Sequence, residues 1–228
     1  FDGANGGDGY YGGKRETRQI NRLTYYDWPG TWKLVKSIQP NAVIMSDIGP
    51  GVRWIGNEHG HANYPCWATF TPEGRNGNPP GIGESRYQIN PVGTDDGKFW
   101  IPGECDVSIR PGWFYHENQN SKVRTPANLL DLYFASVGRG ASFLLNLPPS
   151  KEGQMHSNDV YALKSYGEAL QQLFAKNYTD GAKASANITR KTDAGENFSP
   201  AQVLDNDPTS YWATPDETRQ VSLTIDLA

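Results

Sequence analysis

The sequence lacks two features that mark membrane and nucleic-acid-binding proteins. No apolar run approaches the ~20 residues that a membrane-spanning helix requires. The 21 Lys and Arg residues are scattered, and the formal net charge is −4. A surface that binds nucleic acid or anionic lipid needs a concentration of positive charge. We therefore expect no nucleic-acid partner and no membrane partner.

Cysteine is also scarce, with only Cys66 and Cys105 among 228 residues. One pair in a chain of this length defines no disulfide framework, so free thiols are favoured over a disulfide. The cysteines together with His59, His61 and His116 offer potential metal ligands, but their spacing fits no zinc template. The two neighbouring histidines are more simply turn or rim residues, and we expect no metal and no cofactor.

Aromatic residues, in contrast, are abundant: the chain has 7 Trp and 12 Tyr. Exposed aromatic faces stack on sugar rings, although aromatic residues are ordinarily part of a core. Two acidic residues stand in strings rich in Gly, Asn and aromatics: Asp2 in Phe-Asp-Gly-Ala-Asn-Gly and Glu58 in Val-Arg-Trp-Ile-Gly-Asn-Glu. Glycosidic bond hydrolysis needs two such carboxyl groups. For either residue alone, a turn position is the ordinary interpretation.

Both strings resemble those of glycoside hydrolase family 29, the α-L-fucosidases, and in particular the branch that acts on α-1,3 and α-1,4 linkages. That family places its nucleophile in Trp-Phe-Asp-Gly-Ala and its acid/base in Arg-Trp-x-Gly-Asn-Glu. The resemblance implies that Asp2 attacks the anomeric carbon while Glu58 protonates the leaving oxygen and then activates water. It implies retention of configuration, with the two carboxyl groups about 5–5.5 Å apart.

Residues 102–113 also look like the pattern of that branch. The side chains expected to bind substrate are Arg53, Trp54, Glu104, Asp106, Arg110 and Trp113. For the acidic and basic residues of 102–113, an internal Arg–carboxylate pair that supports the rim of the site is an equally good interpretation.

The order of predicted elements is that of a parallel α/β protein. We expect a loop over 6–22, a helix from Asp27 to Pro40, a strand over 42–46, an irregular active-site wall over 60–98, a helix from Thr125 to Gly138, a strand over 142–147 and a helix over 157–177. The resemblance implies the second half of a (β/α)₈ barrel in residues 1–177. The upstream half, in the same or a companion polypeptide, is expected to complete it.

Residues 178–228 differ in character, with more Thr, Ser, Asp and Asn. They resemble the start of a discoidin-like all-β sandwich, and residues 221–227 alternate at period two as a strand does. The function that the resemblance implies is an exo-acting α-1,3/1,4-L-fucosidase, periplasmic or secreted, that acts on a fucosylated oligosaccharide or glycoconjugate. Two alternatives stay open: a retaining glycosidase with another sugar specificity, and a non-catalytic carbohydrate-binding homologue.

Overall fold

The computed structural model describes residues 7–18, 24–47, 49–71, 91–192 and 195–227. The chain divides into two compact units, Phe1–Ala169 and Leu170–Ala228. Residues 1–6, with the expected nucleophile Asp2, lie outside the described residues. The prediction that Asp2 faces Glu58 across a cleft therefore stays a prediction.

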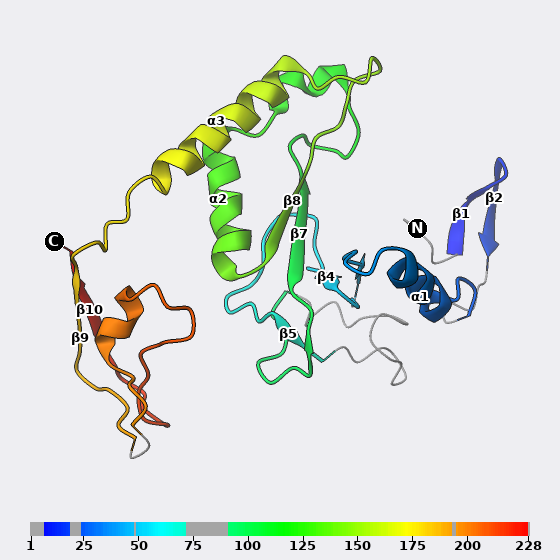
Figure 1. The fold of residues 1–228 in the computed structure, drawn as a ribbon. Helices are drawn as coiled ribbons and strands as arrows, with labels where there is room; N and C mark the ends of the chain where they lie inside the picture. Colours follow the sequence, from blue (N-terminus) through cyan, green and yellow to red (C-terminus); the bar gives the residue numbers. More distant parts are fainter. Residues whose placement is uncertain (1–6, 19–23, 48, 72–90, 193–194, 228) are drawn as a thin grey trace. The chain divides into compact units, whose positions relative to one another are not determined.

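The first unit is built on a four-stranded parallel sheet (Figure 1). Its strands, in spatial order, are β3 (Met45–Ser46), β4 (Val52–Trp54), β7 (Gly103–Ser108) and β8 (Ser142–Asn146). All four carboxyl ends meet at the same edge of this sheet, as they do in any parallel sheet. This confirms the expectation of parallel α/β architecture.

The strand β7 was not predicted, because residues 99–116 were interpreted as a group of acidic and aromatic site residues. Along β7 the buried Cys105 and Val107 alternate with the half-buried Glu104 and Asp106. This alternation has period two, as in a half-buried strand, but its polar positions are carboxylates, which are depleted in strands. Of the strand expected over 42–46, only β3 (Met45–Ser46) forms in the structure. Its Met45 is 44% exposed, whereas the prediction was a buried strand.

The expected loop over 6–22 was also wrong, since it contains an antiparallel hairpin. Its strands are β1 (Gly7–Tyr11) and β2 (Lys14–Arg18), in a register that pairs Tyr11 with Lys14. The two residues between the strands, Gly12 and Gly13, have φ of 60° and 86°. A two-residue hairpin turn with positive φ at both positions favours glycine.

The described residues contain three α-helices, close to where the sequence predicts them. They are α1 (Trp28–Ile38), α2 (Pro126–Ser136) and α3 (Ser157–Leu173). Asp27 and Thr125 cap the first two by accepting from backbone N–H groups, and a proline stands in each first turn, as is typical of helix starts. The 3₁₀ turns Glu117–Lys122 and Val137–Arg139 flank α2.

The helical spacing in sequence predicts one apolar face of α2, formed by Leu129, Leu130, Tyr133, Phe134 and Val137, and this prediction is partly wrong. Leu129 is buried as expected, but Phe134 and Val137 are 51% and 39% exposed. Leu132, which we did not assign to that face, is buried instead. The helix packs against β8, and this contact selects the buried face.

The core of the first unit lies around β7. One buried cluster contains Ile55, Ala62, Cys105 and Ala141, with Cys66 packed against it. Both cysteines are free thiols, as predicted. A second buried pair, Phe70 and Ile101, lies by the antiparallel strands β5 (Thr69–Phe70) and β6 (Phe99–Trp100). The wall expected to be irregular over 60–98 thus contains a short strand.

The second unit contains one antiparallel pair, β9 (Lys183–Ala186) with β10 (Leu223–Asp226), and the 3₁₀ turn η4 (Pro200–Leu204). The strand predicted from period-two alternation over 221–227 is confirmed in β10. Among the residues that the structure describes, no helix combines the length and the apolarity needed to cross a bilayer.

Candidate active site

Glu58 lies four residues beyond β4, in the loop that leaves the carboxyl end of that strand. Asn57 braces this loop by donating its side-chain amide to the backbone oxygen of His61 at 3.0 Å. Gly60 is buried with φ of 77°, and a Cβ at this position would come within 2.8 Å of a Val107 methyl group. Only glycine lets the loop pass so closely over β7.

Two tryptophans link β4 and β7, once between the strands and once between the loops that follow them, through their indole N–H groups. Trp113, which follows β7, donates to Glu58 Oε2 at 3.0 Å. Trp54, the last residue of β4, donates to Asp106 Oδ1 at 2.7 Å. The two bonds are reciprocal, because each strand or its loop supplies one indole and one carboxylate. Four of the side chains predicted for the site are thereby brought together.

The carboxyl groups of β7 lie in an unfavourable environment for negative charge. Burial raises the pKa of Glu104, and the neighbouring charge of Asp106 raises it further. Burial also raises the pKa of Asp106, while the hydrogen bond from Trp54 opposes the shift and the charge of Glu58 adds slightly to it. Carboxyl groups held in this way are typical of functional sites.

Arg110, which the sequence predicts to bind substrate, is engaged inside the protein. The residue is 2% exposed, and its guanidinium bonds Asp159 of α3 through two nitrogens, at 2.9 and 2.5 Å. It also donates to Asn120 Oδ1 at 3.0 Å and lies 4.6 Å from the ring centre of Tyr115. Arg110 therefore forms an internal ion pair, but its partner is Asp159 and not one of the carboxylates of residues 102–113.

Arg53 is also engaged inside the protein. The residue is fully buried, and its guanidinium donates to the backbone oxygens of Ile101 and Trp67 and to Cys66 Sγ. Burial lowers its pKa, which the neighbouring thiol partly offsets. These bonds hold the segments around Trp67 and Ile101 against β4, and a contact of Arg53 with substrate stays a prediction.

Sequence reasoning missed Asp159 and Asn146. Asp159 stands in the first turn of α3, where acidic residues are common for helix-dipole reasons alone, so nothing marked it as a buried partner. Asn146 ends β8 and bonds the loop that carries Trp113. A polar residue that closes an otherwise apolar strand is a weak signal, and it is the only one that could have identified Asn146.

In the described ranges, no group of three or more His, Cys, Asp or Glu side chains is arranged to hold a metal ion. His59 and His61 are exposed, and their rings stack with centres 6.0 Å apart.

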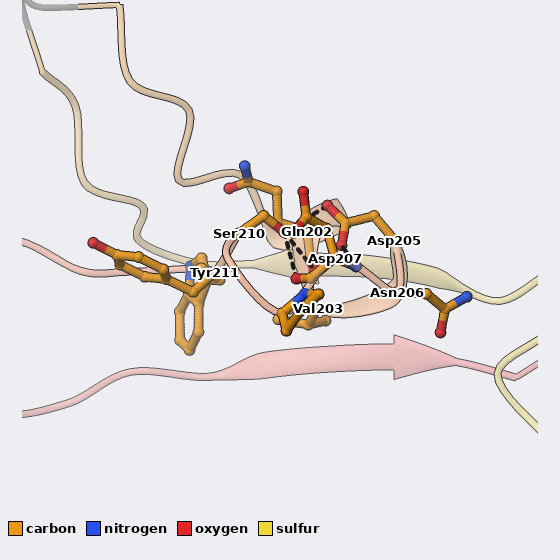
Figure 2. A pocket seen from close by; sticks show the side chains of 9 residues that line it. Gln202, Val203, Asp205, Asn206, Asp207, Ser210 and Tyr211 are labelled. Carbon is orange, nitrogen blue, oxygen red and sulfur yellow. Dashed lines mark hydrogen bonds between the residues drawn. The ribbon is translucent and has the colours of Figure 1, made fainter. Parts of the chain in front are cut away.

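The second unit carries an open pocket (Figure 2). It is lined by Gln202, Val203, Asp205, Asn206, Asp207, Pro208, Ser210, Tyr211 and Trp212. The Ser210 hydroxyl lies 2.7 Å from Asp205 Oδ2 and 3.3 Å from the backbone oxygen of Asp207. These polar groups are engaged with one another, which stabilises the turn around the pocket.

Comparison with known proteins points to one family. The α-L-fucosidase family model matches residues 23–173. Alpha-L-fucosidase 1 of Arabidopsis thaliana is 40% identical over 190 residues, which cover 83% of this chain and 36% of the plant protein.

Solved structures agree. A glycoside hydrolase family 29 member from an unknown rumen bacterium superposes with a TM-score of 0.71 at 39% identity, over 85% of this chain and 33% of that one. A family 29 fucosidase of Ruminococcus gnavus, solved in complex with fucose, superposes with a TM-score of 0.66 at 26% identity. The match covers 96% of this chain and 43% of that one. The chain thus spans between about a third and less than half of these relatives. From its family match and its plant relative, the chain belongs to the α-L-fucosidase family.

Proposed function

We propose that the protein carrying this chain is an exo-acting α-L-fucosidase that cleaves α-1,3 and α-1,4 linkages with retention of configuration. The observation that carries the proposal is the position of Glu58, at the carboxyl ends of adjacent parallel strands and bonded to Trp113. Active sites of parallel α/β proteins lie at this edge. The fucose bound in the Ruminococcus gnavus relative supports fucose as the sugar.

In the proposed mechanism Asp2 is the nucleophile and Glu58 the acid/base. Asp2 displaces the aglycone to form a covalent fucosyl intermediate, while Glu58 gives its proton to the departing oxygen. Glu58 then removes a proton from the water that hydrolyses the intermediate. Its side chain belongs to an exposed residue, which is consistent with proton exchange with solvent between the two steps.

The proposed substrate contacts are four of the six residues expected from the sequence: Trp54, Trp113, Glu104 and Asp106. The two carboxylates can accept hydrogen bonds from sugar hydroxyl groups. Trp113 is 37% exposed, so part of its ring is open to stacking on a sugar.

The parallel sheet of the first unit supports its proposed place in the second half of a (β/α)₈ barrel, over residues 1–177. Barrel closure removes unpaired strand edges, and the strands β3 and β8 end the observed sheet order. We propose that an upstream half, in the same or a companion polypeptide, pairs with them. Residues 178–228 are proposed to begin a discoidin-like sandwich, and the protein is proposed to be periplasmic or secreted.

The experiment is an assay of the complete protein that carries this chain, on a Lewis-type trisaccharide and on an aryl α-L-fucoside. Release of fucose from both is expected, with the α-anomer formed first. Asp2→Asn should nearly abolish turnover and leave binding intact, because the amide keeps the shape of the nucleophile but not its reactivity. Turnover of another aryl glycoside alone would indicate a different sugar specificity, and binding without turnover would indicate a non-catalytic homologue.

A further inference from the structure

We infer that Asn146 is a positioning residue for Glu58, acting through Trp113. The inference rests on the proposed function only in giving Glu58 its acid/base role. The contacts that carry it link the ends of three neighbouring parallel strands, β4, β7 and β8.

Asn146 ends β8 directly opposite Ser108, the last residue of β7. Its side-chain amide donates to Ser108 Oγ and to the backbone oxygen of Trp113, both at 3.0 Å. Ser108 Oγ in turn donates to the backbone oxygen of Gly112 at 2.8 Å. The turn that carries Trp113 is therefore held at two successive carbonyl groups.

A held backbone at Trp113 gives its indole a defined direction. The indole N–H reaches Glu58 Oε2 at 3.0 Å. Glu58 is exposed in a loop, and an exposed Glu side chain otherwise samples several rotamers. The contacts thus run from Asn146 to the Trp113 backbone and from the Trp113 indole to Glu58.

The chemistry of this position favours an amide. Both acceptors that Asn146 meets require a donor, and the Asn side chain supplies two N–H groups. Asn146→Asp keeps the shape but turns a carboxylate oxygen toward the Trp113 carbonyl, so that two acceptors face each other. The variant should release the turn without creating a cavity.

A matched control stands at the start of α3. Asn158 also donates its side-chain amide to a backbone oxygen, that of Asn120, at 2.7 Å. Asn158→Asp makes the same chemical change without touching Trp113 or Glu58.

The first test measures kcat and KM of the complete protein on fucosides with good and poor leaving groups. Only poor leaving groups need a well-placed acid. We expect Asn146→Asp and Trp113→Phe each to lower kcat on the poor substrate about tenfold more than on the activated one, since misplacement of a catalytic group costs up to about a hundredfold. KM should change little, because Phe keeps an aromatic face. Asn158→Asp should behave as the wild type.

The double variant separates positioning from general weakening. If Asn146 acts through Trp113, Asn146→Asp should cause almost no further loss of kcat on the poor substrate when Trp113 is already replaced by Phe. Additive losses, or equal losses on both substrates, would overturn the inference.

A second measurement does not depend on activity. In a ¹H–¹⁵N spectrum the indole signal of Trp113, assigned from Trp113→Phe, should move in both Glu58→Gln and Asn146→Asp. The Trp212 signal, from the second unit, should stay in place. If the chemical shift of the Trp113 indole does not change in Asn146→Asp, the inference is refuted, even if the wild-type protein hydrolyses fucosides. An inactive wild type with the expected shifts would instead refute the proposed function alone.

Discussion

Arg110 and Asp159 form a buried ion pair that fixes the segment after β7 to the first turn of α3. The Arg110 Nη2 and Asp159 Oδ2 atoms are 2.5 Å apart, and the two side chains are 0% and 1% exposed. The carboxylate also lies in the first turn of the helix, where the helix dipole favours negative charge. The chain that leads to Trp113 therefore begins from an anchored point.

Asp159→Ala should destabilise the protein by about 3–5 kcal/mol, because it leaves the buried Arg110 guanidinium without its counter-charge. Urea unfolding of the complete protein checks this. The control is Asp216→Ala, which breaks the Arg190–Asp216 pair, whose side chains are 40% and 81% exposed. An exposed pair contributes about 0–1 kcal/mol. Similar losses in both variants would contradict a special role for the buried pair.

Glu58→Gln should impair fucosides with poor leaving groups far more than activated aryl fucosides, because only the former need a proton from the enzyme. The measurement is kcat/KM on a series of aryl α-L-fucosides with increasing leaving-group pKa, which should slope more steeply in the variant. Equal slopes for the variant and the wild type would show that Glu58 binds substrate or stabilises the fold without acting as the acid.

Glu104→Gln should stabilise the fold at pH 7, while it weakens turnover if Glu104 contacts the sugar. The pKa of Glu104 is raised in the folded state by burial and by Asp106. The protonated form therefore favours folding, and this stability is lost as the pH rises through the folded-state pKa. The Gln side chain does not ionise, so the variant keeps this stability at pH 7. The difference in stability between variant and wild type should vanish below about pH 4.5, the ordinary pKa of a Glu side chain.

The unfolding midpoint in urea at pH 7 and at pH 4 measures this difference. Glu168→Gln, which changes an exposed residue on α3, serves as the control and should show no comparable gain at pH 7. A Glu104→Gln variant that is less stable than the wild type at both pH values would contradict the assigned environment.

Native alkylation should distinguish the two cysteines. Burial raises the pKa of the Cys105 thiol to about 12, and the residue is fully buried. Iodoacetamide at pH 8 attacks thiolates, so Cys105 should stay unmodified until the protein unfolds. Cys66 is partly exposed, and burial also raises the pKa of its thiol, so it should react slowly. Peptide mass spectrometry reports both, and rapid labelling of Cys105 would contradict the buried position.

Much of the local structure follows from the sequence alone. Polar caps, early prolines and helical spacing predicted α1 and α2, and a short apolar run predicted β8. These signals lie within a few residues of one another, where local backbone preferences and hydrophobic periodicity act. The strings around Asp2 and Glu58 likewise sufficed to recognise the fucosidase family.

Tertiary structure alone decided which partners the polar side chains take. Asp106 and Trp54, 52 residues apart, are joined by a hydrogen bond between neighbouring strands, and the Arg110–Asp159 pair spans 49 residues. The sequence contains both charges but no measure of the distance between them, so substrate contact and internal pairing looked equally good. Burial made the choice, because an enclosed guanidinium must find its acceptors inside the protein. The strand β7 was likewise recognised only from the tertiary structure, in which β4 and β8 pair with its two edges and the positions beside its carboxylates, Cys105 and Val107, are buried.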